Sequence, residues 1–120
     1  MKLPNGERAV IDVGGKLLGY CLNTEHRLGR HKARVFASAL GITAADPTPL
    51  VEALRTAAAS GEAHFRKGND YGREYEIELI MQGPNRPFVI VSAWFIDAGA
   101  EVPRLTNCYV SLAKSKESRL

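Results

Sequence analysis

The sequence is poor in cysteine, histidine and tryptophan, and it contains no long hydrophobic run. Its 120 residues include two cysteines, Cys21 and Cys108, three histidines and one tryptophan. The cysteines form no CxxC pair and have no histidine cluster beside them, which favours buried thiols over a disulfide or a zinc site. No apolar run approaches the roughly 18–20 residues of a membrane-spanning helix. The first eight residues also lack the apolar segment of a signal peptide. We therefore expect a cytoplasmic protein with no membrane partner.

Several motifs that carry chemistry in other proteins are also missing. The chain has no GxxxxGK[ST] loop, no GxGxxG, no HExxH, no GxSxG and no acidic cluster suited to a metal ion. Gly14-Gly15 precedes a short predicted helix, but two glycines are too little to indicate a phosphate-binding loop. If the protein is an enzyme, we expect chemistry that needs no metal and no cofactor.

What the sequence does contain is the composition of one globular domain. Apolar residues make up 45% and charged residues 24% of the chain. A chain of this length buries roughly two thirds of its unfolded surface, which allows a core without metals or disulfides. We expect a single domain over residues 1–113 and a polar tail over 114–120.

The positive charge is concentrated in one segment. The net charge is +3, and residues 26–34 contain four Arg or Lys and two His but no acid. Acids occur elsewhere, for example at Glu74, Glu76 and Glu78 on alternating positions. A polyanionic partner such as RNA is compatible with this polarised charge but is not required by it.

The hydrophobic period changes at Gly61, which predicts an α+β fold. Before Gly61 apolar residues recur with the helical period, and after it they alternate between short turn-forming segments. We expect N-terminal helices packed on a C-terminal four-stranded antiparallel meander. The expected elements are an extended piece over 8–12, helices over 16–22, 30–40 and 46–60, and strands over 62–67, 71–81, 86–97 and 103–112.

The second expected helix carries the first candidate site. Lys32 borders the apolar stripe of this helix, about 40° from Phe36 on a helical wheel with 100° per residue. Its ammonium would hold a phosphate in a cleft over the sheet, or its stem would simply cover apolar surface. His26, Arg27 and Arg30 surround the start of the helix, where amide groups and guanidinium groups suit an anion. The alternative is a solvated basic face.

The last two expected strands carry the second candidate site. Ser92 and Trp94 interrupt an apolar run, while Arg104, Thr106 and Tyr109 follow on the next strand. Strict alternation places Thr106 and Tyr109 on opposite faces, so a β-bulge is required for them to converge. The alternative is an ordinary strand that tolerates Ser and Thr.

Nearly the whole chain resembles a small bacterial domain family of unassigned function. The pattern is most specific at the GRHKA segment, residues 29–33. It extends over the opening 1–12, 16–17, 20–23, 25–26, 29–37, 83–85, 92–94, 103–105 and 108–110. One departure is Arg27, since the family tends to have proline after the loop histidine. This family is similar to the barnase, EndoU, colicin and RelE-like group, in which many members are metal-independent ribonucleases of toxin systems. The resemblance also implies a small inhibitor protein, which we expect to be acidic.

Our leading hypothesis is therefore a toxin-type ribonuclease domain that cleaves RNA through attack of the 2′-hydroxyl. It needs a base, an acid and positive charge from the protein. The alternative is a non-catalytic module that binds a partner protein or nucleic acid through the same basic surface. A catalyst requires a histidine and a lysine or arginine that converge in one cleft, whereas a binding module does not. The expected catalytic residues are His26, His31, Lys32 and Tyr109, and the expected substrate-binding residues are Arg30, Arg34, Ser92, Trp94, Arg104 and Thr106.

Overall fold

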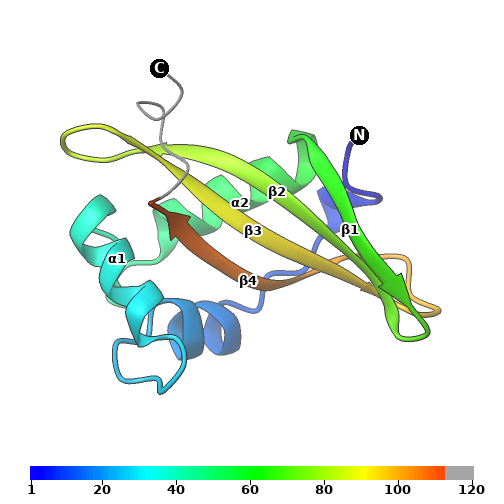
Figure 1. Cartoon of the computed structure of the whole chain (residues 1–120), viewed down its shortest axis with the longest axis horizontal. Coiled ribbons are helices and arrows are strands. Elements are labelled where there is room, and N and C mark those ends of the chain that lie inside the picture. The colour runs from blue at the N-terminus through cyan, green and yellow to red at the C-terminus, as the bar shows by residue number, and fades with distance from the viewer. Residues whose placement is uncertain (113–120) are drawn as a thin grey trace.

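The computed structural model describes residues 1–112 and has the expected α+β order, with helices first and one antiparallel sheet after them (Figure 1). The predicted polar tail over 114–120 lies outside the described residues. The helical elements are η1 (Gly6–Arg8), η2 (Val13–Cys21), α1 (Arg30–Leu40) and α2 (Thr48–Ser60), and the strands are β1 (Ala63–Asn69), β2 (Gly72–Gln82), β3 (Pro87–Asp97) and β4 (Arg104–Ser111).

The four strands form a meander in the order β1-β2-β3-β4, with every neighbouring pair antiparallel. This confirms the predicted sheet, and the strand ends differ from the expected ones by two residues at most. The turn from β1 to β2 is tight, and Gly72 at the start of β2 has a φ of 151°, which L-residues rarely adopt. The edges of the sheet are therefore β1 on one side and β4 on the other.

The segment before the first long helix differs from the prediction. Val10 makes an isolated parallel bridge to Arg104, and Val13–Cys21 forms a π-helix instead of the expected helix over 16–22. The helix begins early because the Asp12 side chain accepts a hydrogen bond from the Gly15 amide at 2.9 Å. Gly14-Gly15, expected to precede the helix, therefore lies inside it. A π-helix has a wider turn than an α-helix, and Leu18 is exposed although Leu17 and Cys21 are buried.

The two α-helices follow the prediction closely. α1 ends at Leu40, and Gly41 closes it with a φ of 70° in the left-handed region. Glycine is preferred at this position because it has no Cβ to clash. α2 begins at Thr48, two residues later than expected, and Pro49 lies in its first turn, where a missing N–H removes no helical bond.

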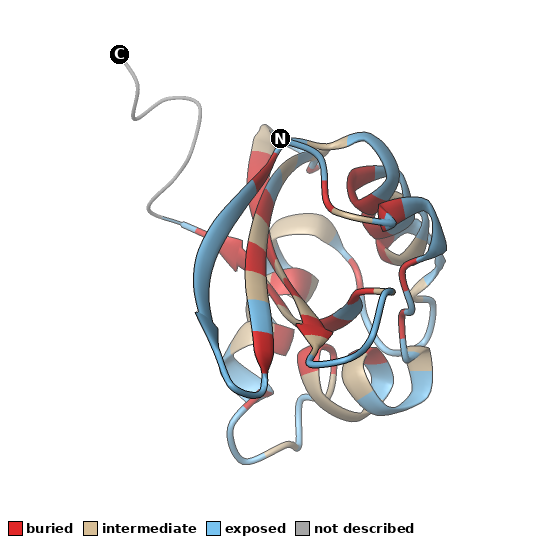
Figure 2. Cartoon of the chain, turned by 90° about the vertical axis from the view of Figure 1, so that its right-hand side faces the viewer, coloured by how far each residue is buried: buried red, intermediate tan, exposed pale blue. Residues whose placement is uncertain are grey.

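The helical elements pack on one side of the sheet (Figure 2). α2 contacts β2, whereas η2 and α1 contact β4 and each other. The core between the layers is apolar and includes Leu17, Phe36, Leu54, Ile77 and Trp94. Residues 26–34, in the loop and α1, therefore lie near the β4 edge of the sheet. Within residues 1–112, no helix is both long and apolar enough to cross a membrane.

Candidate functional site

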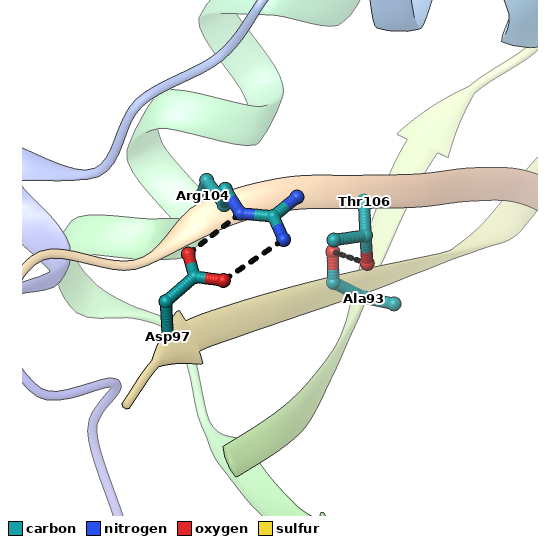
Figure 3. Close-up of polar contacts among 4 residues, drawn as sticks. All are labelled: Ala93, Asp97, Arg104 and Thr106. Atoms are coloured by element: carbon teal, nitrogen blue, oxygen red, sulfur yellow. Dashed lines mark hydrogen bonds and ion pairs between the residues drawn. The ribbon is translucent and has the colours of Figure 1, made fainter. Parts of the chain in front are cut away.

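A β-bulge in β4 shapes the candidate site. Asn107 pairs with Ala93 of β3 and Leu105 pairs with Trp94, so Thr106 is an extra residue between them. Thr106 Oγ1 donates to the Ala93 carbonyl at 3.2 Å (Figure 3). The extra residue shifts the alternation, so Leu105 and Cys108 are both buried although they are three residues apart. Thr106 and Asn107 then lie on the rim of a pocket.

This pocket, which we call the η2–β4 pocket, has a volume of about 430 Å³. It lies between the π-helix, the loop before α1 and the bulge of β4, and none of the residues that line it is acidic. The lining residues are Gly15, Lys16, Gly19, Tyr20, His26, Leu28, Thr106 and Asn107.

Tyr20 is the residue on which the polar groups of the pocket converge. Lys32 Nζ donates a hydrogen bond to Tyr20 Oη at 3.0 Å and lies 5.1 Å from the centre of its ring. Lys16 Nζ lies 6.0 Å from the same ring. The His26 ring meets the Tyr20 ring edge-on, with centroids 4.9 Å apart. Lys32 is thus directed toward Tyr20 and not into bulk solvent, and two cations and an imidazole surround one phenol.

The loop before α1 holds His26 in one orientation. His26 Nδ1 accepts hydrogen bonds from the amides of Leu28 at 2.9 Å and Gly29 at 3.0 Å. Two donors on Nδ1 place the ring proton on Nε2, so the free side of the ring is a hydrogen-bond donor. His26 therefore suits donation of a hydrogen bond to a phosphate oxygen better than removal of a proton. From the sequence we expect His26 to be a catalytic residue.

Gly29 allows the loop to approach Tyr20. A Cβ at Gly29 would lie 2.4 Å from the Tyr20 carbonyl oxygen and 2.9 Å from Tyr20 Cδ1, closer than carbon atoms are tolerated. The backbone amide of Gly29 also donates to His26 Nδ1. Glycine at this position thus brings the imidazole and the phenol together.

Comparison with known proteins identifies the family of the chain. A family model described as a domain of unknown function, DUF6883, matches residues 2–112. The chain belongs to the DUF6883 family. No curated protein and no solved structure matches it. The family match agrees with the expected small domain of unassigned function, whereas the expected similarity to ribonuclease toxins remains a prediction.

Ser92 and Trp94, two of the expected substrate-binding residues, are buried in this DUF6883 chain and do not line the η2–β4 pocket. Both have no exposed surface. Ser92 Oγ donates to the Ile77 carbonyl at 2.9 Å and accepts from Trp94 Nε1 at 2.9 Å. Ser92 thus supplies the buried indole N–H with an acceptor, which explains a hydroxyl in an apolar run.

Arg104, which the sequence suggests for contact with phosphate, is paired with Asp97 in the structure. Its Nε donates to Asp97 Oδ2 at 2.8 Å and its Nη2 to Asp97 Oδ1 at 3.1 Å (Figure 3). The hydrogen bonds from Arg104 hold the pKa of Asp97 below its usual value. The guanidinium also lies 5.5 Å from the Phe95 ring. Arg104 therefore joins the ends of β3 and β4 and is not among the residues that line the η2–β4 pocket.

The remaining expected site residues do not line this pocket. Arg30, His31 and Arg34 are exposed on α1. Tyr109 and His31 line a second, smaller pocket together with the Lys32 side chain. The bulge thus exists, but Thr106 and Tyr109 line different pockets. Of the expected residues, the η2–β4 pocket brings together His26 and Thr106, with Lys32 reaching it through Tyr20.

Two buried thiols lie beneath the site. Cys21 and Cys108 are free and have no exposed surface, as the sequence predicts. A hydrogen bond from the Cys108 thiol lowers the pKa of Cys21, and the charges of Lys32 and Lys16 act in the same direction despite burial. That same hydrogen bond and burial raise the pKa of Cys108. Within residues 1–112, no group of three or more His, Cys, Asp or Glu side chains is arranged to hold a metal ion.

Sequence reasoning assigned no role to Tyr20 or Lys16. Both are in the π-helix, four residues apart, and a wide helical turn of more than four residues places them on one side. The available signal was a tyrosine and a lysine in an otherwise apolar or small-residue helix. The expected helix over 16–22 did not indicate that Lys16 and Tyr20 would face the basic segment over 26–34.

Proposed function

We propose that this DUF6883 domain is a metal-independent ribonuclease of the toxin type, with Tyr20 at the centre of its active site. The observation that carries the proposal is the hydrogen bond of 3.0 Å from Lys32 Nζ to Tyr20 Oη, beside a histidine that faces the same phenol over a concave pocket. A histidine and a lysine that converge on one group are what a catalyst requires. A module that only binds a partner through its basic surface needs no such convergence.

The proposed reaction is an internal transfer of the RNA phosphate. Tyr20 Oη, which accepts the hydrogen bond from Lys32 Nζ, takes the proton of the 2′-hydroxyl and passes its own proton to solvent. The 2′-oxygen forms a bond to phosphorus, and the bond from phosphorus to the 5′-oxygen breaks. The leaving 5′-oxygen takes a proton from the Lys16 ammonium, and solvent returns that proton from Tyr20 to Lys16. The products are a 2′,3′-cyclic phosphate and a 5′-hydroxyl.

The other residues of the pocket stabilise the charge that develops on the phosphate. His26 donates through Nε2 to a non-bridging oxygen, since Nδ1 is occupied by two amides. The Lys32 ammonium lies beside the same oxygens. Donors of this kind in a preorganised site each contribute about 10²–10³-fold to the rate. The 2′-hydroxyl supplies the nucleophile, so the reaction needs no metal-bound water.

The exposed arginines next to the pocket supply the approach for RNA. Arg27, Arg30 and Arg34 are exposed in the loop and on α1. Positive charge near a site raises the rate of association with a polyanion. A small acidic inhibitor protein, as the toxin hypothesis includes, would cover the same segment, and the substrate would be cytoplasmic RNA.

The test is cleavage of RNA by the purified protein in the presence of EDTA. Tyr20→Phe keeps the ring against His26 but removes the hydroxyl, so we expect the rate to fall by about 10²–10⁴-fold. Tyr71→Phe is the matched control, since Tyr71 is highly exposed in the turn before β2. Cyclic phosphate ends should be found by mass spectrometry. RNA that binds the wild-type protein without being cleaved would instead support the non-catalytic module.

A further inference from the structure

A second pocket lies between α1 and β4, beside the proposed active site. Its volume is about 230 Å³, and its lining residues are His31, Lys32, Val35, Tyr109 and Val110. Two valines and the lysine stem supply apolar walls, and two residues supply flat rings. We call it the α1–β4 pocket. Its walls suit a flat, largely apolar group such as an aromatic base.

Lys32 connects the two pockets. Its side chain lines the α1–β4 pocket, while its ammonium reaches the Tyr20 hydroxyl in the η2–β4 pocket. A group that occupies the α1–β4 pocket therefore lies next to any phosphate held by Lys32 and His26. β4 also contributes to both pockets, because Asn107 lines the η2–β4 pocket and Tyr109 lines the α1–β4 pocket.

The distance between the pockets matches one nucleotide. Asn107 pairs with Ala93 and Tyr109 with Val91, so both lie on the same face of β4, two residues apart. Two residues along a strand span about 7 Å. This is comparable with the reach of a nucleotide from its phosphate to its base.

Tyr109 is available for contact with a ligand. Its ring is only partly buried, and its hydroxyl makes no hydrogen bond to another residue within 1–112. The walls of the pocket offer few groups that read the edge of a base. Recognition there would depend on stacking and apolar contact, which tolerate any base but favour the larger ring system.

We propose that the α1–β4 pocket is the nucleobase subsite of this domain, with Tyr109 as the stacking residue and a preference for purines. This proposal rests on the proposed ribonuclease function and names the part of the substrate that the site recognises. Tyr109 thereby becomes a binding residue, in place of its expected catalytic role.

The test compares three probes, adenosine 3′-monophosphate, uridine 3′-monophosphate and inorganic phosphate, in calorimetric titrations of the whole chain. We expect the adenine nucleotide to bind several-fold tighter than the uracil nucleotide and both to bind tighter than phosphate. Tyr109→Leu should weaken binding of adenosine 3′-monophosphate by about tenfold, since the base then has no ring on which to stack. The same variant should leave the affinity for phosphate unchanged. Tyr71→Leu is the control for removal of an exposed tyrosine.

A second variant tests the pocket without replacement of Tyr109. If Tyr109→Leu does not fold, Val35→Glu tests the same pocket from α1, because its carboxylate would oppose the nucleotide. Nucleotide and phosphate affinities that are equal, or a Tyr109→Leu protein with unchanged nucleotide affinity, would overturn the subsite. Nucleotide binding that depends on Tyr109 in a protein that cleaves no RNA would retain the subsite and reject the ribonuclease.

Discussion

Lys32 in α1 and Tyr20 in the π-helix are joined by a hydrogen bond of 3.0 Å between the ammonium and the phenol oxygen. Lys32 is half-buried at the border of the apolar stripe of its helix, where an apolar residue would pack without losing hydration of a charge. The phenol replaces part of that hydration. The hydrogen bond therefore fixes the direction of the lysine and joins two helices beside the pocket.

The first prediction separates the charge of Lys32 from its packing. Lys32→Met keeps a stem of similar length but removes the ammonium, so the melting temperature should be unchanged or slightly higher. Removal of a stabilising cation should lower RNA cleavage by about 10²–10³-fold. Thermal unfolding and single-turnover cleavage measure the two effects. Lys67→Met serves as control, since Lys67 is exposed on β1 at the opposite edge of the sheet. A large fall in melting temperature would contradict this account.

The second prediction concerns the buried hydroxyl of Ser92. Ser92→Ala leaves the Trp94 indole N–H in the core without its acceptor, which should lower the free energy of unfolding by about 1–3 kcal/mol. Urea unfolding followed by the fluorescence of Trp94 measures this. Ser38→Ala, at an exposed position of α1, should have little effect. RNA cleavage by the folded Ser92→Ala protein should equal that of the wild type, and a specific loss of cleavage would restore Ser92 to the site.

The third prediction is a pH dependence of stability that comes from Asp97 and Arg104. The pKa of Asp97 is lower in the folded protein because Arg104 bonds its charged form. Its contribution is therefore complete above the ordinary aspartate pKa and is lost as the pH falls through the lowered folded value. Asp97→Asn should lower the urea midpoint at neutral pH, and the difference from wild type should vanish in acid. Asp70→Asn, in the turn between β1 and β2, is the control. An equal difference at both pH values would contradict the assignment.

The fourth prediction uses the salt dependence of RNA binding. Arg30→Gln with Arg34→Gln should weaken binding of any RNA sequence, since these exposed side chains meet the backbone only. The slope of log affinity against log salt should decrease by about 0.7 for each phosphate of a single strand that the variant no longer neutralises. Filter binding over a range of salt concentrations measures this slope. Arg66→Gln, on β1 at the far edge, should leave the slope unaltered. An unchanged slope in the double variant would place RNA elsewhere.

Local patterns in the sequence were sufficient for most of the fold. Helical spacing with a terminal glycine predicted α1 to the residue, and alternation with turn residues predicted the four strands. These features depend on neighbours in the chain, so the sequence shows them directly. The π-helix escaped prediction, because a cap from Asp12 to Gly15 and a wider turn outweighed the low helical preference of two glycines.

The candidate site was predicted only in part, and the reason is long-range geometry. The basic segment, Lys32 and His26 were visible because they are close in the sequence. The contacts of Ser92 and Arg104 could not be predicted from the sequence. They form with Trp94 Nε1 and with Asp97, and these partners are placed by the fold of the sheet. The sequence by itself thus determined the order of helices and strands and the location of the positive charge. Only the tertiary structure decided that Lys32 contacts Tyr20. Both η2 and α1 pack against the edge strand β4, and this packing brings together two side chains that are not neighbours on any one helix.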